Sequence, residues 1–210
     1  MTYRTEQETF WAGNFGSEYI QRNQGDMLLA SNLFFFTRAL HRTRGIESCI
    51  EFGANIGMNL RALKLLNPNI DAHAIEINKE ACGHLGTLIE PSKVYNKSIL
   101  DFTPSTLRCD LVLIKGVLIH INPEALPNVY GKLVEACGRY LLIAEYYNPT
   151  PMTLLYRGHS NRLFKRDFAG EIMDRHPQLQ LVDYGFMYHR DKNCPQDDIS
   201  WFLMEKQSKF

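Results

Sequence analysis

The sequence predicts an α/β fold in which seven mostly parallel strands form a doubly wound sheet with an antiparallel edge strand. Two observations predict it. Short apolar runs alternate with segments of helical periodicity along most of the chain, which is typical of a parallel sheet covered by helices. The chain then ends in two segments of alternating hydrophobicity, which favours an antiparallel strand pair at one edge of that sheet.

The expected elements follow one another along the chain. An N-terminal helical region, 5–44, is interrupted near 23–26. Strands are expected at 48–52, 72–77, 94–99, 110–115 and 139–145, with helices at 58–66, 78–89 and 123–137 between them. We expect a long aromatic loop or lid at 146–161, a short helix at 168–174, and the final strands at 179–189 and 199–206.

The length and composition favour one compact domain. The chain has 210 residues, of which 45% are hydrophobic, and this is enough for a sizeable core. We therefore expect a single domain, 1–210, made of an N-terminal helical cap, 1–45, and an α/β core, 46–210. The 23 basic and 23 acidic residues give a formal net charge of zero, which argues against nucleic acid as the main partner.

The cysteines and the first residues indicate a reducing, aqueous compartment. The five cysteines are widely scattered and form no CxxC pair, which argues against a disulfide framework and against a structural zinc site. The segment 1–15 is polar and aromatic, unlike a signal peptide. The apolar stretch 28–36 is too short to span a membrane. We therefore expect a cytoplasmic protein with no membrane partner.

A glycine-containing turn follows the first expected strand and opens a helix. Its spacing is Glu51-x-Gly53-x-Asn55-x-Gly57. Such a turn lets backbone N–H groups and a helix N-terminus approach a ligand. It differs from the dinucleotide fingerprint G-x-G-x-x-G, which argues against a nicotinamide-dependent oxidoreductase. Asn55 takes the middle glycine position, because asparagine tolerates a left-handed backbone better than most residues.

An acidic residue and an apolar segment follow the next two strands. Glu76 ends the second strand, where a carboxylate can accept hydrogen bonds from both ribose hydroxyls of an adenosine. Ile99 or Leu100 would pack against the adenine ring, and Asp101 would accept from its exocyclic amine. Each feature alone is also typical of an ordinary turn, a solvated acid or a core residue. Together, in this order, they indicate an adenosine-containing ligand.

These segments resemble the class I S-adenosylmethionine-dependent methyltransferases, which have a Rossmann-like fold, over almost all of the chain after residue 47. The matching segments are Glu51 to Gly57, Ile75 to Ile77, Ser98 to Asp101 and Leu113 to Ile121. More narrowly, the chain resembles the pseudaminic acid biosynthesis-associated methylases. That resemblance rests on the opening Phe10-Trp11-x-Gly13-x-Phe15-Gly16-x-x-Tyr19-x-x-Arg22-Asn23 and on Glu145-Tyr146-Tyr147-Asn148-Pro149.

The resemblance implies S-adenosyl-L-methionine as the cofactor and assigns residues to it. The residues that would surround its methionine half are Glu51, Gly53, Ala54, Asn55, Gly57, Lys115 and Gly116. Those that would hold its ribose and adenine are Glu76, Ile77, Ile99, Leu100 and Asp101. Tyr19 and Arg22 share one face of the N-terminal helix and would close over the cofactor, unless that helix only covers an edge of the sheet.

Methyl transfer requires alignment, exclusion of water and, for some acceptors, removal of a proton. The candidate catalytic residues are His120, Glu145 and Tyr146, and the candidate substrate-binding residues are Tyr147, Asn148 and His159. Most of them follow the fourth and fifth strands, at the sheet edge where ligands of open α/β sheets bind. The alternative for each is packing within the loop or lid, or a surface position. No metal-ligand spacing is present.

The function that these patterns and the resemblance favour is methyl transfer to an oxygen or nitrogen of a small polar metabolite, such as a sugar or amino-sugar derivative. The alternatives are an RNA or protein methyltransferase and a non-catalytic S-adenosylmethionine-binding partner protein. The neutral charge and the lack of an Asn-Pro-Pro-Tyr segment argue against an RNA or protein acceptor.

Overall fold

A computed structural model of the protein describes residues 3–207 and contains one large, mostly parallel sheet. The strands β1 to β5 run parallel to one another, and β9 is antiparallel to both of its neighbours. The order is β3-β2-β1-β4-β5-β9-β8, from the strands β1 (Ser48–Phe52), β2 (Asp71–Glu76), β3 (Val94–Asn96), β4 (Cys109–Lys115), β5 (Cys137–Glu145), β8 (Leu179–Met187) and β9 (Ile199–Lys206). The predicted fold class is confirmed.

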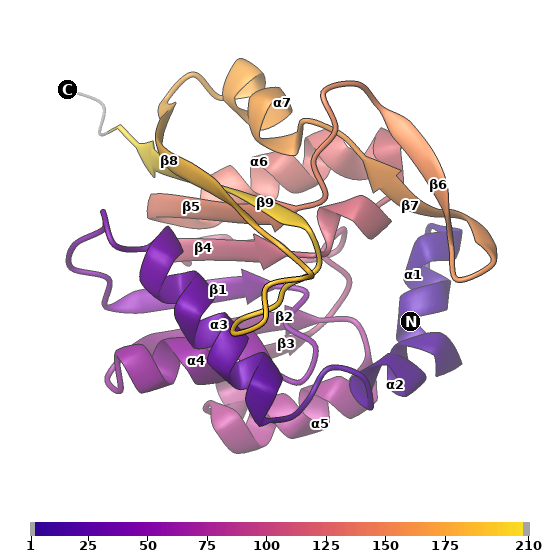
Figure 1. Cartoon of the computed structure of the whole chain (residues 1–210), viewed down its shortest axis with the longest axis horizontal. Helices are drawn as coiled ribbons and strands as arrows, with labels where there is room; N and C mark the ends of the chain where they lie inside the picture. The colour runs from indigo at the N-terminus through magenta and orange to yellow at the C-terminus, as the bar shows by residue number, and fades with distance from the viewer. Residues whose placement is uncertain (1–2, 208–210) are drawn as a thin grey trace.

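Helices cover both faces of this sheet (Figure 1). One face packs against α3 (Asp26–Ala39), α4 (Met58–Leu66) and α5 (Lys79–Leu88), and the other against α6 (Leu126–Ala136) and α7 (Phe168–Arg175). The helices α1 (Glu6–Ala12) and α2 (Asn14–Ile20) lie beyond the carboxyl ends of the parallel strands. This arrangement places the N-terminal segment over the edge where the site residues were predicted.

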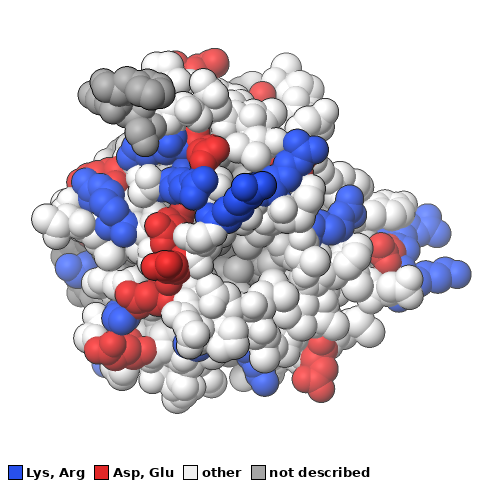
Figure 2. Space-filling view, turned by 90° about the vertical axis from the view of Figure 1, so that its left-hand side faces the viewer, with Lys and Arg blue, Asp and Glu red and all other residues white. Residues whose placement is uncertain are grey.

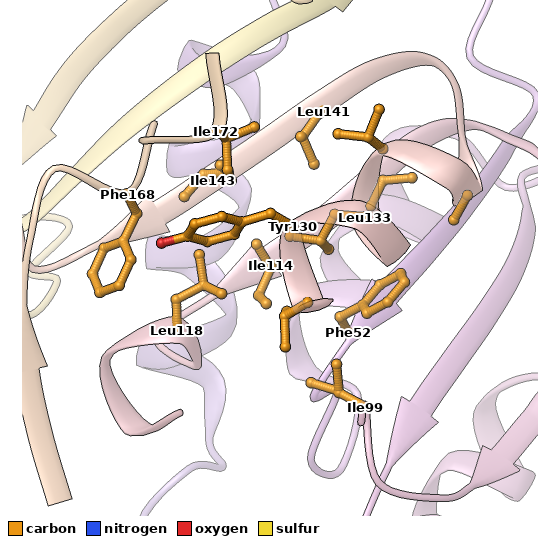
Figure 3. Close-up of a cluster of buried hydrophobic side chains, with 14 of the residues drawn as sticks. Phe52, Ile99, Ile114, Leu118, Tyr130, Leu133, Leu141, Ile143, Phe168 and Ile172 are labelled. Carbon is orange, nitrogen blue, oxygen red and sulfur yellow. The ribbon is translucent and has the colours of Figure 1, made fainter. Parts of the chain in front are cut away.

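The face beneath α6 and α7 has a closely packed core (Figure 3). Tyr130 on α6 is fully buried and lies among Leu118, Phe168 and Ile172. Its hydroxyl donates to a Glu171 carboxylate oxygen 2.8 Å away on α7, so its polar atom is satisfied. Burial of such side chains on both faces supplies the main driving force for the fold.

Several predicted elements have limits that differ by one to three residues in the structure, among them the third strand, and the N-terminal helical region has an additional break. The helical region is broken near residue 23, as predicted, and also at Gly13, where α1 ends and α2 begins. The third strand ends at Asn96 and not at residue 99, because the carbonyl of Ser98 accepts from the N–H groups of Asp101 and Phe102 and turns the chain.

The predicted loop at 146–161 is wrong. Most of that segment belongs to a hairpin of β6 (Met152–Tyr156) and β7 (His159–Lys165), which form a separate two-stranded sheet. A two-residue turn, Arg157-Gly158, joins the strands, and both residues have positive φ, 50° and 85°. Arginine at such a turn is a weak hairpin signal, which is why the sequence pattern does not show it.

Basic and acidic side chains lie next to one another on the side where the parallel strands begin (Figure 2). The ion pair between Arg139 and Glu205, 2.9 Å long, lies at that end of β5 and β9. Within residues 3–207, no helix combines the length and apolar character needed to cross a bilayer.

Candidate active site

The turn after β1 packs tightly against its neighbours. Gly53, Asn55 and Gly57 all have positive φ, at 78°, 49° and 83°. The N–H groups of Gly53 and Ala54 donate to the carbonyl of Ile75, at 2.8 and 3.1 Å. A Cβ atom built on Gly53 would lie only 2.7 Å from Cγ2 of Val117. Glycine is therefore required at position 53 both for conformation and for space.

Glu76 connects this turn with the start of the next helix. One carboxylate oxygen accepts from the N–H of Asn55 and the other from the N–H of Asn78, each at 2.7 Å. The side chain is buried, and burial raises the pKa of this carboxyl although the backbone hydrogen bonds oppose the shift. Each oxygen retains a lone pair for a further donor.

A cavity of about 440 Å³ lies at the carboxyl edge of the sheet, within the usual range of small-molecule sites. Its floor is formed by the ends of β1, β2 and β4, and its roof by α1, α2 and the hairpin. The predicted site residues that line it are Tyr19, Gly53, Ala54, Asn55, Glu76, Ile77, Ile99, Leu100, Lys115, Gly116, His120 and Tyr146. The structure thus brings together segments that are far apart in the sequence.

Two of the predicted acids lie beneath the cavity wall. Glu51 accepts from the side-chain amide of Asn59 at 2.6 Å, and burial raises the pKa of Glu51 to about 8. Glu145 accepts from the N–H groups of Val117 and Leu118, at 2.9 and 2.8 Å, and burial raises its pKa to about 7. Both carboxyls support cavity-lining segments without themselves lining the cavity.

The remaining predicted residues lie outside the cavity lining. Asp101 forms an ion pair with Arg4, 2.6 Å long, and Arg22 lies 3.8 Å from Glu18 and over the ring of Phe15. Gly57 packs against α5, where an added Cβ would meet Leu85 and Leu88 at 2.8 Å.

The predicted substrate-binding residues also have other contacts. Tyr147 packs on Phe202, at 6.0 Å between ring centroids, and is 42% exposed. The side-chain amide of Asn148 donates to the carbonyl of Thr150 at 2.6 Å. His159 packs against Phe10 of α1, at 5.0 Å between ring centroids. Tyr147 and Asn148 follow β5 and precede the hairpin, whereas His159 begins β7, and none of the three lines the cavity.

His120 presents one ring nitrogen as a free acceptor. Its Nδ1 is hydrogen-bonded to the carbonyl oxygen of Arg162 on β7. A carbonyl can only accept, so Nδ1 carries the proton and Nε2 has the lone pair. The ring is buried between Trp11 and Tyr156, at 4.7 Å from each ring centroid. Burial lowers the pKa of His120 to about 4, which keeps the imidazole neutral at physiological pH.

Aromatic side chains from separate elements form the wall around His120. Trp11 on α1, Tyr19 on α2, Tyr146 after β5 and Tyr156 on β6 all line the cavity. Burial raises the pKa of Tyr19 to about 12 and also raises the pKa of Tyr146, so both phenols are neutral. This wall excludes water and provides ring faces for a ligand.

The end of β4 contributes a cation and an open backbone position. Lys115 lines the cavity with its ammonium 5.6 Å from the ring centroid of Phe35, and burial lowers the pKa of Lys115. Gly116 has a positive φ of 68°, and a Cβ atom built on it would meet no atom within 4 Å. The space next to Gly116 is therefore available to a ligand.

Sequence reasoning missed several cavity residues. Among them, four residues each have a buried polar atom that finds no hydrogen-bond partner within residues 3–207: Oδ1 of Asn59, Oε1 of Gln7, Oε1 of Glu8 and Nε1 of Trp11. Asn59 lies at the start of the helix that follows the glycine turn, and this position was an available signal. The others lie on α1, whose amphipathic pattern does not show which face meets the cavity.

Among residues 3–207, no group of three or more histidine, cysteine or acidic side chains has the arrangement of a metal site.

No protein-family model and no curated protein sequence matches the chain. Solved structures do. Magnesium protoporphyrin IX methyltransferase, ChlM, from Synechocystis PCC 6803 with bound S-adenosylmethionine is 11% identical over 99% of this chain and 100% of its own, with a TM-score of 0.67. Plantazolicin methyltransferase BpumL with S-adenosylhomocysteine is 11% identical over 96% and 95%, with a TM-score of 0.66.

Mitomycin 7-O-methyltransferase MmcR is 12% identical over 96% of this chain and 61% of its own, with a TM-score of 0.68. At these identities the likeness concerns the fold alone. The resemblance to the pseudaminic acid biosynthesis-associated methylases stays a prediction, since no family model matches. The chain has the Rossmann-like fold that these S-adenosylmethionine-dependent methyltransferases share.

Proposed function

We propose that the protein is a methyltransferase that uses S-adenosyl-L-methionine. The observation that carries the proposal is the buried carboxylate of Glu76, which lines the cavity and holds the turn after β1 through the N–H of Asn55 at 2.7 Å. A carboxylate at the end of β2 suits a ribose diol, because it can accept from both hydroxyls.

The residues around Glu76 fit the rest of this cofactor. Ile99 and Leu100 are buried at the cavity wall and would pack against adenine. The unpartnered Oδ1 of Asn59 would accept from the methionine ammonium, with Glu51 holding Asn59 from behind. The ammonium of Lys115 would pair with the methionine carboxylate.

Glu8 offers an acceptor for the exocyclic amine of adenine, the role expected of Asp101. One of its carboxylate oxygens accepts from the N–H groups of Arg4 and Thr5, at 2.8 and 2.9 Å, and the other is buried and has no partner among residues 3–207. Asp101 is instead neutralised by Arg4. We assign this adenine contact to Glu8.

The cofactor, when bound, supplies a methyl group activated by a positively charged sulfur. The chain aligns the acceptor and excludes water with Trp11, Tyr19 and Tyr156 around the reaction space. Nε2 of His120 accepts the proton that a hydroxyl or ammonium acceptor releases, because its lone pair is fixed by the Nδ1 bond to Arg162. Tyr146 contributes a neutral phenol to the same wall.

We propose a small polar metabolite as the acceptor, with methylation at an oxygen or nitrogen, and a sugar or amino-sugar derivative as the class to test first. Aromatic faces beside unpartnered acceptor oxygens suit a hydroxyl-rich ring. The resemblance to the pseudaminic acid biosynthesis-associated methylases favours the same class.

Calorimetry with S-adenosylhomocysteine tests the cofactor, and transfer of a labelled methyl group to a panel of nucleotide sugars tests the acceptor. We expect saturable binding of S-adenosylhomocysteine and no binding of NAD. Absence of S-adenosylhomocysteine binding would refute the proposal. Binding with no transfer to any acceptor, including RNA and peptide controls, would indicate a non-catalytic binding protein.

A further inference from the structure

Arg157 occupies a turn position that disfavours arginine. The turn Arg157-Gly158 joins β6 to β7, with Tyr156 paired to His159 on either side. Its φ values of 50° and 85° are those of a type I′ turn, in which Asn-Gly is the preferred pair. A side chain longer than asparagine is strained in the left-handed region. Strained residues of this kind cluster at ligand sites and other functional positions.

The guanidinium of Arg157 is a free cation at the mouth of the cavity. It lines the cavity and lies 5.8 Å from the ring centroid of Tyr156. Within residues 3–207, no carboxylate lies within ion-pair distance of it. By contrast, Arg162 and Arg166 on and after β7 are paired with acidic residues, each at 2.7 Å.

Arg157 lies close to the proposed proton acceptor, His120. Tyr156 packs on the ring of His120, at 4.7 Å between centroids, so the free cation and the proton acceptor flank one tyrosine. Asp197 also lines the mouth, and it remains available to accept from a hydroxyl or ammonium of the same ligand. Within residues 3–207, three lysine and arginine side chains line the cavity without an ion pair: Arg157 on the hairpin turn, Lys97 after β3 and Lys115 at the end of β4. Of these, only Arg157 lies on the hairpin beside Tyr156 and His120.

We infer that the methyl acceptor carries an anionic group, a carboxylate or a phosphate, and that Arg157 binds this group while the atom to be methylated faces His120. The inference rests on the proposed function and narrows its acceptor class to anionic small metabolites. A guanidinium binds either anion through paired N–H donors.

Arg157→Asn separates binding from folding, because asparagine fits the turn better than arginine does. We expect the variant to have a Tm equal to or higher than that of the wild type and the same affinity for S-adenosylhomocysteine. The rate of label transfer at sub-saturating acceptor should fall about 10- to 100-fold, the usual effect of losing a charge-assisted bond. Arg61→Asn, at an exposed position on α4 outside the cavity, is the matched control.

The acceptor class is tested with methyl-labelled S-adenosylmethionine and a small-molecule extract, separated by anion exchange after reaction. Label in the anion-binding fraction that depends on Arg157 and not on Arg61 supports the inference, and phosphatase treatment then distinguishes phosphate from carboxylate. Label only in neutral or cationic fractions, a wild-type rate for Arg157→Asn, or a lower Tm for that variant would overturn it. Loss of S-adenosylhomocysteine binding would instead place Arg157 on the cofactor. If the wild type transfers no label although it binds S-adenosylhomocysteine, the proposed function itself fails.

Discussion

The carboxylate of Glu76 accepts a hydrogen bond from the backbone N–H of Asn55, 2.7 Å away, and so links the end of β2 to the turn after β1. The link explains how asparagine can replace glycine in this turn. Asn55 has a φ of 49°, which asparagine adopts at modest cost, and the acid fixes its backbone. The same carboxylate is the group that we assign to the ribose.

Glu76→Ala should weaken binding of S-adenosylhomocysteine by roughly 1–3 kcal/mol, the usual range for charge-assisted hydrogen bonds. Calorimetry measures this directly. The variant also leaves the N–H groups of Asn55 and Asn78 without an acceptor, so we expect a lower free energy of unfolding in urea. Glu76→Gln keeps the size and one acceptor and should lose less in both measurements. Unchanged affinity in the alanine variant would remove Glu76 from the ribose contact.

His120→Asn should lower the rate of methyl transfer by about 10²–10⁴-fold, the typical contribution of a general base. The asparagine amide can replace Nδ1 as donor to the carbonyl of Arg162 but offers no basic lone pair in place of Nε2. Affinity for S-adenosylhomocysteine should therefore stay near that of the wild type. A variant with the wild-type rate would show that His120 serves only to hold the hairpin.

The depressed pKa of His120 also predicts an acid-sensitive part of the stability. The folded-state pKa of about 4 lies below the ordinary 6.5, so the unfolded chain binds a proton more readily than the folded one. The contribution of neutral His120 to the free energy of unfolding is therefore fully present above about pH 6.5 and is lost as the pH falls towards 4. In urea unfolding at several pH values, the wild type should lose more stability than His120→Asn between pH 6.5 and 4.5. Parallel losses would contradict the predicted pKa of His120.

The raised pKa of Glu51 predicts that part of the folding stability is lost as the pH rises, the opposite direction to the effect of His120. Its carboxyl has a pKa of about 8 in the folded protein, against an ordinary value of 4.5, because it is buried. Its ionisation therefore favours the unfolded chain, and its contribution to stability falls as the pH rises from 4.5 through 8. Glu51→Gln should remove roughly 1–3 kcal/mol of this decline between pH 5 and 8 in the ligand-free protein. Equal declines in the two proteins would contradict the assignment.

Gly53→Ala and Gly116→Ala separate steric clash from backbone strain. Both glycines have positive φ, but an added Cβ at position 53 would lie 2.7 Å from Val117, whereas at position 116 it would meet no atom within 4 Å. We expect Gly53→Ala to be the more destabilising by about 1–3 kcal/mol in urea unfolding. Gly116→Ala should chiefly weaken S-adenosylhomocysteine binding, because Gly116 lines the cavity. Equal losses of stability would contradict the predicted clash.

Much of the fold could be predicted because the parallel strands are apolar runs of the right length. The strand predicted at 199–206 matches β9, and the helix predicted at 58–66 matches α4. Glu76, Lys115 and His120 each end or follow a parallel strand, so they lie at the carboxyl edge of the sheet. The positions of these residues after predicted strands are enough to indicate this.

The remaining features depend on contacts between distant segments. The hairpin reverses at Arg157, a residue that turn preferences disfavour, so the pattern indicated a loop. The orientation of Asp101 is set by Arg4, which is 97 residues away (101 − 4). The unpartnered amide oxygen of Asn59 becomes visible only when the cavity is formed. The spacing of apolar residues indicates whether a segment is a strand or a helix. The role of a side chain depends on the distant residues that it contacts in the folded protein.

The hydrogen bond between His120 and the carbonyl of Arg162 joins residues 42 positions apart. Its acceptor belongs to β7 of the hairpin, whereas the glycine turn that lines the same cavity follows a strand of the large sheet. A hairpin that lifts to admit an acceptor takes this carbonyl with it, and the imidazole is then free to change tautomer and rotate. The proton acceptor is thus assembled only when the roof is closed. With the roof open, water that enters the cavity therefore meets an imidazole that is not held in position to take a proton from it.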